Sequence, residues 1–272
     1  MTADGRYRSL LFLFGFIAAC TIVSASRWPI NRLIPLWAVC CQFMRGRMGN
    51  EMVSSPILLA VAMLLVMGLG TLAARLWKTY GFASGLNTAA VAVRPTRLAH
   101  ILTDLGLAQH TVVLASEMPL AFCFGLLRPR ICLSTGLADV LSGKELTAVL
   151  LHEDYHRRHY DPLRTLMAEV LATTLFFLPV AAELRDLFLT STELEADQSA
   201  AHLAGRPSLA GAMHKLLTHP LAVSLPAPGI SGLSASEARV AVLLGDPVAP
   251  LRLSSHSLIT SSAILMLVCV LA

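Results

Sequence analysis

Long stretches without a charged side chain constrain this fold more than any other feature of the sequence. Residues 52–74 are mostly apolar and carry no charge, and Arg75 and Lys78 follow them. At about 1.5 Å per residue, a helix of this length is long enough to cross the hydrocarbon core of a bilayer. We therefore predict a transmembrane helix over residues 52–75.

Two further stretches are uncharged over a similar length. They are residues 9–26, which follow Arg6 and Arg8, and residues 253–272 at the C-terminus. We predict that both span the membrane, with a cleaved signal peptide as the alternative for residues 9–26. Residues 33–44 are too short to cross alone, so a short span and a re-entrant or interfacial piece both stay open.

The composition agrees with an integral membrane protein. Apolar residues make up 55% of the 272 residues and charged residues only 14%, which is unusual for a soluble domain. The net charge of +4 is small and the basic residues are scattered, so we expect no direct nucleic-acid binding. The predicted organisation is a membrane region over residues 1–78, a polar domain over residues 79–252 and the C-terminal span. The sequence indicates no oligomeric state.

Basic residues near the predicted spans favour a polar domain that faces the cytosol, at the plasma (inner) membrane. Positive side chains accumulate on the cytosolic side of spans. Those after the strongest span are Arg75, Lys78, Arg94 and Arg97. Four arginines within residues 27–47 oppose this orientation, unless residues 33–44 also cross or dip into the membrane.

From residue 79 onward the pattern becomes that of a small mixed domain. Apolar residues at helical spacing predict an amphipathic helix over residues 96–107, and residues 234–244 read as a short helix. Two or three short strands are predicted, with a hairpin over residues 120–134. The strand candidates are residues 111–115, 120–124 and 130–134. The predicted fold class is mainly α, with a small β-sheet, flanked by transmembrane helices.

His152, Glu153 and His156 form the pattern H-E-x-x-H. Positions i and i+4 share one face of a helix, so the two imidazoles can converge on one metal ion. Glu153 lies beside them and can reach a water that the metal polarises, as zinc hydrolases require. Ser142 and Glu145 form a capping box upstream, which predicts a helix that begins there and carries the motif.

The stretch after the motif is apolar enough to be mistaken for a membrane span. A single crossing there would place any downstream metal ligand on the opposite side of the membrane. We therefore predict a buried or membrane-apposed helix over residues 161–178, a turn at Pro179, and an antiparallel helix over residues 180–204. Gly205 and Pro207 are expected to end that second helix.

Glu193 and Asp197 lie one turn apart on the returning helix. A two-histidine site lacks a third ligand, and a carboxylate on a facing helix can supply it. We predict Glu193 as that ligand and Asp197 as a hydrogen-bond acceptor for a ligand imidazole. An ordinary solvated acidic face is the alternative for this pair.

The cysteines do not suggest a metal site, because no C-x-x-C pattern exists. Cys123 and Cys132 are expected to be buried free thiols, and a disulfide between them requires an oxidising compartment. Three residues are weaker candidates to stabilise an oxyanion, and each has a structural alternative: Tyr155, Tyr160 and His202. His159 reads as a polar surface histidine.

Four segments occur in the same order as the motifs of one protein family. They are residues 122–137, the run E-L-T-A-V-L-L-H-E-D-Y-H at 145–156, Asp161 with the proline after it, and E-L-E-A-D at 193–197. Together, over about residues 95–245, they resemble the BlaR/MecR-type membrane metallopeptidases and, more distantly, the HtpX and CAAX-prenyl proteases. Such proteins are gluzincins, with H-E-x-x-H and a downstream glutamate.

The resemblance implies a membrane zinc endopeptidase that takes part in signalling. It implies Zn²⁺ held by His152, His156 and Glu193, with Glu153 as catalytic base and Asp197 beside a ligand. The expected partner is a protein or peptide substrate, with a transcriptional repressor as one candidate. The strand residues Ala121, Phe122 and Cys123 are expected to bind extended substrate through main-chain hydrogen bonds, although an ordinary edge strand stays the alternative.

Two departures from the family pattern matter. The sequence stops at Ala272, after the last predicted span, where antibiotic-sensing relatives carry a penicillin-binding sensor, so we do not expect β-lactam sensing. Asp154 directly follows the motif glutamate, and we expect it to face water. Two other classes of function stay open: a receptor subunit that signals through a partner with little proteolysis, and a membrane scaffold without metal.

Overall fold

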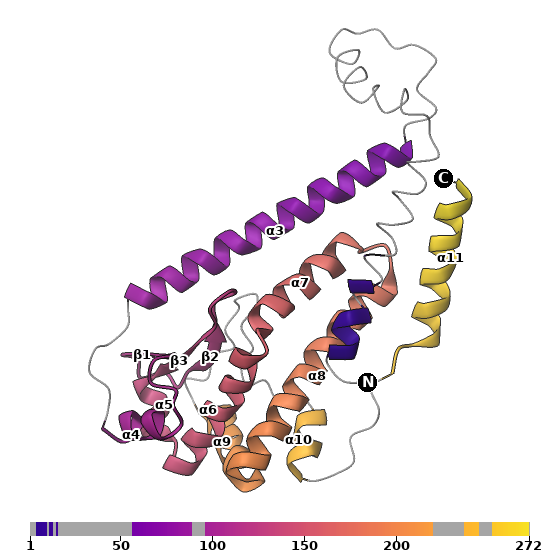
Figure 1. Ribbon diagram of the computed structural model, residues 1–272. Helices are drawn as coiled ribbons and strands as arrows, with labels where there is room; N and C mark the ends of the chain where they lie inside the picture. Colours follow the sequence, from indigo (N-terminus) through magenta and orange to yellow (C-terminus); the bar gives the residue numbers. More distant parts are fainter. Residues whose placement is uncertain are drawn as a thin grey trace.

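The computed structural model describes residues 4–9, 11–12, 15, 56–88, 96–219, 237–244 and 252–271. The elements in these ranges are α3 (Pro56–Thr88), α4 (Thr96–Asp104), β1 (Thr111–Leu114), β2 (Ala121–Phe124), β3 (Arg130–Ser134), α5 (Thr135–Val140), α6 (Gly143–Arg158), α7 (Asp161–Thr174), α8 (Pro179–Ala204), α9 (Arg206–Thr218), α10 (Glu237–Leu244) and α11 (Ser255–Leu271). The prediction of a mainly helical chain with a small sheet is confirmed (Figure 1).

The three strands form one sheet in the order β1-β3-β2. β2 pairs antiparallel with β3, which confirms the predicted hairpin, and β1 pairs parallel with β3. Side chains alternate between the faces of a sheet. Ile131 and Leu133 therefore belong to a core shared with α4, α5 and α6. Phe122 and Cys132 pack on the other face, against Leu86 near the end of α3.

α6 begins at the predicted capping box. The Ser142 hydroxyl accepts a hydrogen bond from the Glu145 N–H at 3.4 Å, and the Glu145 carboxylate accepts one from the Ser142 N–H at 2.7 Å. Both bonds satisfy N–H groups that have no partner within the helix. The histidine motif therefore lies on a helix whose start is fixed by its own sequence.

α7 and α8 form the predicted helical hairpin, side by side in Figure 1. α7 ends at Thr174, earlier than predicted, and Pro179 occupies the first turn of α8, where proline is well tolerated. Leu171 and Phe188 belong to the apolar core between them. α8 also lies against α6, so its buried side faces the motif helix.

Two helices, α5 and α9, were not predicted. Gly205 ends α8 with φ of 87°, as expected, but Pro207 lies in the first turn of α9 instead of marking the end of helical structure. Proline fits a first helical turn because its missing N–H has no helical partner there. Leu209 and Ala212 of α9 are fully buried.

α3 continues to Thr88, well past the predicted end at residue 75. Arg75 lies within the helix, and its guanidinium pairs with Glu169 of α7. Gly68 also allows close packing there, since a Cβ atom at this position would lie 2.9 Å from the Thr174 hydroxyl oxygen. α3 and α7 are therefore joined by an ion pair and a close contact.

Within the parts of the chain that the structure describes, no helix combines the length and apolarity needed to cross a membrane. α3 and α11 show that the predictions for residues 52–75 and 253–272 are right about helical structure, from Pro56 and Ser255 onward. Most of residues 9–26 and all of residues 33–44 lie outside the described residues.

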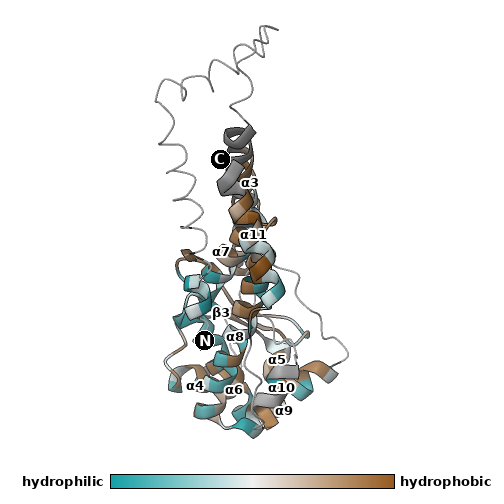
Figure 2. Ribbon diagram, turned by 90° about the vertical axis from the view of Figure 1, so that its right-hand side faces the viewer, coloured by the Kyte–Doolittle hydropathy of each residue, from teal (hydrophilic) through white to brown (hydrophobic). Residues whose placement is uncertain are grey.

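Hydropathy differs between the two ends of the molecule. Figure 2 shows hydrophobic residues along α3 and α11, and more hydrophilic ones around α4 and α6. α11 contacts the first turns of α8. Glu183 accepts hydrogen bonds from the Ser254 N–H at 2.6 Å and from the Ser257 hydroxyl. The Val180 N–H donates to the Ser261 hydroxyl oxygen at 3.1 Å.

Candidate metal centre

α6 and α8 bring two imidazoles and one carboxylate together. The Nε2 atoms of His152 and His156 are 3.1 Å apart. Glu193 Oε2 lies 3.6 Å from His152 Nε2, and Glu193 Oε1 lies 3.6 Å from His156 Nε2. The structure thus brings together the three side chains that the sequence predicts as ligands.

These separations fit a single metal ion. Two atoms that each lie about 2.1 Å from an ion in tetrahedral geometry are about 3.4 Å apart. The observed separations of 3.1 and 3.6 Å fall on either side of that value. Both imidazoles are fully buried, and two nitrogens with one carboxylate oxygen form a donor set that zinc accepts.

Glu153 is completely buried next to the ligands, and neither of its carboxylate oxygens has a hydrogen-bond partner among the described residues. Burial raises the pKa of Glu153, against the lowering effect of His152 and His156. A buried carboxylate without partners is costly and calls for an explanation. Among the described residues, no structural partner accounts for it.

His152 is supported by a carboxylate from α8. Its Nδ1 lies 3.0 Å from Asp197 Oδ1, as the sequence predicts for a ligand imidazole. Burial alone lowers the pKa of His152, but the neighbouring carboxylates of Asp197 and Glu193 raise it to about 9. A carboxylate on Nδ1 leaves Nε2 directed to the metal position, which fixes the side of the ring that can bind.

Asp197 in turn binds Arg239 of α10. The arginine Nε and Nη2 atoms donate to the two oxygens of Asp197 at 2.6 and 2.7 Å, and Nη1 lies 3.0 Å from Glu193 Oε2. Arg239 is only 1% exposed. Burial opposes ionisation of Glu193, yet His152, His156 and Arg239 lower its pKa to about 2. The sequence reading missed Arg239, because nothing in its local pattern marks it.

His156 is supported by a residue from the start of α7. Its Nδ1 lies 2.9 Å from Asp161 Oδ2, and Arg164 donates to Asp161 Oδ1 at 3.2 Å. Tyr160, with φ of 55°, turns the chain between α6 and α7 so that Asp161 points back at the motif. Asp161 belongs to one of the segments that carry the family resemblance, but its sequence context predicts no role for it.

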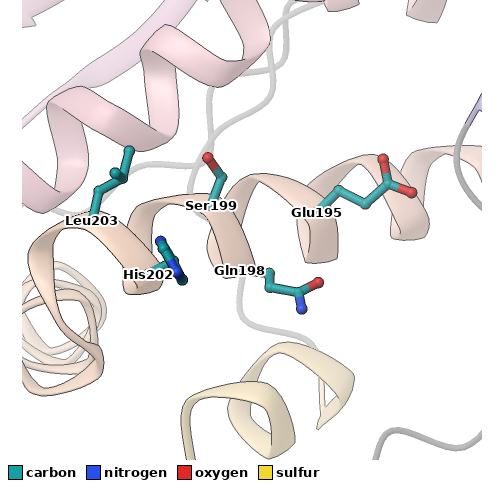
Figure 3. A pocket seen from close by; sticks show the side chains of 5 residues that line it. All are labelled: Glu195, Gln198, Ser199, His202 and Leu203. Carbon is teal, nitrogen blue, oxygen red and sulfur yellow. The ribbon is translucent and has the colours of Figure 1, made fainter.

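The weaker candidates have other contacts. The Tyr155 hydroxyl donates to Glu195 Oε2 at 2.9 Å, and the His159 ring stacks on the Tyr155 ring at 4.0 Å. Tyr160 is at the helix corner, half-exposed. His202 belongs to an open pocket of about 390 Å³ on α8, shown in Figure 3. At about 100° per residue, that pocket lies on the opposite face of α8 from Glu193.

One expectation about the motif is wrong. Asp154 does not face water but is buried, and its carboxylate pairs with Arg157 and Arg158 of the same helix. Their Nε atoms lie 2.7 and 2.5 Å from its two carboxylate oxygens. The expectation of buried free thiols is confirmed for Cys123 and Cys132.

The family model described as BlaR1 peptidase M56 matches residues 44–210. This chain belongs to the BlaR1 peptidase M56 family. The predicted resemblance is therefore confirmed, and the family implies a metallopeptidase with a metal at the His152, His156 and Glu193 cluster. No curated protein matches the sequence. The match to the BlaR1 peptidase M56 family ends before α10, so Arg239 lies outside it.

Proposed function

We propose that this chain is a membrane-bound zinc endopeptidase that hydrolyses peptide bonds of a protein substrate. One observation carries the proposal. His152, His156 and Glu193 converge around one position, and Glu153 lies next to them with both carboxylate oxygens free of partners among the described residues. A carboxylate of this kind has no evident structural role, but it suits a general base.

The residues divide the work in a simple way. Zinc held by the three side chains would supply a Lewis acid that activates water and polarises the scissile carbonyl. Glu153 takes a proton from the attacking water and later delivers it to the leaving amine nitrogen. Asp197 and Asp161 lie against the Nδ1 atoms of the two imidazoles, which leaves each Nε2 on the side of the metal position as a ligand.

The edge strand β2 is the proposed substrate-binding strand. It has a neighbour on one side only, since the sheet order among the described strands is β1-β3-β2. β2 also packs against α6, and the charge of Glu153 adds to burial in raising the pKa of the Cys123 thiol. An extended peptide paired with Ala121, Phe122 and Cys123 therefore comes close to the catalytic base.

The proposed location is a membrane, with the zinc domain facing the cytosol. The uncharged stretch over residues 52–74 supports this, as do the basic residues after it. Large apolar side chains are exposed on the described parts of α3 and α11, among them Val66, Leu69, Ile259 and Met266. Labelling single cysteines introduced near residue 94 in intact and permeabilised cells tests the orientation, because cytosolic thiols react only after permeabilisation.

The decisive experiment compares the wild type with Glu153→Gln in a proteolysis assay and in metal analysis. We expect about one zinc per chain in both proteins and a loss of cleavage of at least 100-fold in the variant, because only the base is removed. A transcriptional repressor co-expressed from the same source is a suitable first substrate.

The same pair of proteins tests the receptor alternative. If signalling output persists in Glu153→Gln, the chain acts through a partner and the peptidase proposal is wrong. If purified wild type binds no zinc at all, both proposals fail and a scaffold without metal is the better description.

A further inference from the structure

Arg239 uses all three of its guanidinium nitrogens on carboxylates of α8. Nε and Nη2 bind the two oxygens of Asp197 at 2.6 and 2.7 Å, and Nη1 lies 3.0 Å from Glu193 Oε2. The planar guanidinium is rigid, so its two hydrogen bonds to Asp197 and its ion pair with Glu193 set the positions of both carboxylates relative to one another. One of them is a metal ligand, and the other holds a ligand imidazole.

Arg239 is distant in sequence from the metal ligands that it lies close to. It comes from α10, a short helix that packs on α8 and α9. The BlaR1 peptidase M56 match stops at residue 210, so α10 lies beyond the family segment. The ligands lie inside the match, while this supporting residue is supplied by a later part of the chain.

The negative charges around the site explain why a positively charged side chain is needed beside the metal ligands. Glu153, Glu193 and Asp197 are three carboxylates within one small region, and Glu153 and Asp197 are fully buried. Like charges this close favour protonation or displacement of one member. Arg239 compensates two of them directly, and its own burial at 1% exposure means that it has little access to water instead.

Asp197 links Arg239 to the ligand His152. Its Oδ1 atom is shared, since it accepts from Arg239 Nη2 and lies 3.0 Å from His152 Nδ1. Without the arginine fork, Asp197 can rotate about its terminal bond, and His152 loses a fixed partner. Support of this kind typically contributes a factor of about 10–100 in metal affinity.

We propose that Arg239 is a positioning residue of the metal centre, and that α10 completes the site by holding Glu193 and Asp197 in ligand-ready positions. This inference rests on the proposed function only in taking His152, His156 and Glu193 to bind zinc. A simpler alternative is that the ion pair merely fastens α10 to α8 and leaves the metal centre unaffected.

Zinc affinity and thermal stability of the full-length chain in detergent separate these two roles. Arg239→Gln removes the charge, and Arg239→Lys keeps the charge but loses the planar fork. The matched control is Lys215→Ala, which breaks the 2.7 Å ion pair with Glu145 on the same domain without contacting the ligands. Zinc affinity is measured by competition with a chelator, well below the melting temperature of each protein.

We expect zinc binding about 10–100-fold weaker in Arg239→Gln and about tenfold weaker in Arg239→Lys, with no change in Lys215→Ala. The absorption spectrum of the Co²⁺-loaded protein provides a second measurement, and we expect the bands of the wild-type tetrahedral site to be altered in both arginine variants. Arg239→Lys keeps the inference testable if Arg239→Gln does not fold.

Three outcomes overturn the inference. The first is a lower melting temperature with unchanged zinc affinity in both arginine variants, which is the result for a simple fastening. The second is tighter zinc binding in Arg239→Gln, which means that the arginine only repels the metal. The third is an equal loss of affinity in Lys215→Ala. A wild type that binds zinc tightly but cleaves no peptide refutes the proposed peptidase function. The inference about Arg239 is then decided by the zinc affinities of the variants alone.

Discussion

The two ligand histidines have the same kind of support, built in different ways. Each Nδ1 contacts an aspartate, and each aspartate contacts an arginine. For His156 the partners are Asp161 and Arg164, all within nine residues of the sequence. For His152 they are Asp197 and Arg239, which come from two other helices.

The two supports differ in whether their arginine has other partners or access to water. Arg164 is 13% exposed, also pairs with Asp4 at 2.6 Å, and lies over the rings of Tyr7 and Phe188. Arg239 is almost completely buried, and it pairs with the site carboxylates Glu193 and Asp197. A local support forms as soon as one helix corner forms, whereas a long-range support requires the whole domain. We therefore expect the His152 side to be the more sensitive one.

The largest effect is expected from the ligands themselves. His152→Ala and His156→Ala each remove one of three protein ligands, so zinc per chain should fall from about one to nearly zero in both. Metal analysis of the purified variants beside the wild type measures this. Equal zinc in the wild type and in His156→Ala removes the site as described.

Substitution of Asp197 and of Asp161 should affect the free energy of unfolding to different extents. Asp197→Asn leaves the buried Arg239 without a charged partner at that position, and we expect a loss of about 3 kcal/mol in the free energy of unfolding. Asp161→Asn should cost only about 1 kcal/mol, because Arg164 keeps another carboxylate and some water. Melting temperatures of the zinc-free proteins compare the two, and a larger loss in Asp161→Asn contradicts the comparison.

Arg164→Ala tests the support of His156 at the arginine that binds Asp161. We expect zinc affinity to fall by less than tenfold, since Asp161 also stays fixed by its position in the first turn of α7. Chelator competition beside Arg239→Gln gives the ratio directly. An effect of Arg164→Ala equal to that of Arg239→Gln shows that sequence distance makes no difference to the support.

The smallest effect is expected at the start of α6, where Glu145→Gln weakens the capping box by about 1 kcal/mol. The hydrogen bond from Lys215 lowers the pKa of Glu145 from an ordinary 4.5 to about 2. A lowered pKa means that its stabilisation is present above pH 4.5 and is lost as the pH falls towards 2. The melting-temperature gap between wild type and variant should therefore shrink over that range. A gap that does not depend on pH rules out the charge as its cause.

Features that depend on neighbours in sequence could be predicted. The capping box at Ser142, the i and i+4 histidines and the hairpin all follow from short patterns, and the structure contains each of them. Glu193 could also be predicted as a ligand. A two-histidine motif needs a third ligand such as a carboxylate, and the second helix of a hairpin brings a carboxylate back to the side of the histidines. These inferences needed only local geometry and one turn of the chain.

Features that depend on backbone conformation or on distant packing could not be predicted. Asp161 reaches His156 only because Tyr160 adopts a left-handed conformation that its sequence does not demand. Arg239 lies 42 residues beyond Asp197, on a helix whose pattern says nothing about its partner. Asp154 was expected to face water because the sequence does not show that Arg157 and Arg158 both pair with its carboxylate.

The hydrogen bonds between α11 and the first turns of α8 have a mechanical consequence. α8 is one continuous helix of 26 residues, and Glu193 lies ten residues after Glu183, about 15 Å along its axis. A tilt of about 10° at the α11 end therefore shifts Glu193 by roughly 3 Å. Ligand distances in zinc sites vary by only about 0.2 Å. Because α11 is bonded to the same helix that carries Glu193 and Asp197, we expect displacement of the C-terminal helix to change the distances between the three ligand side chains.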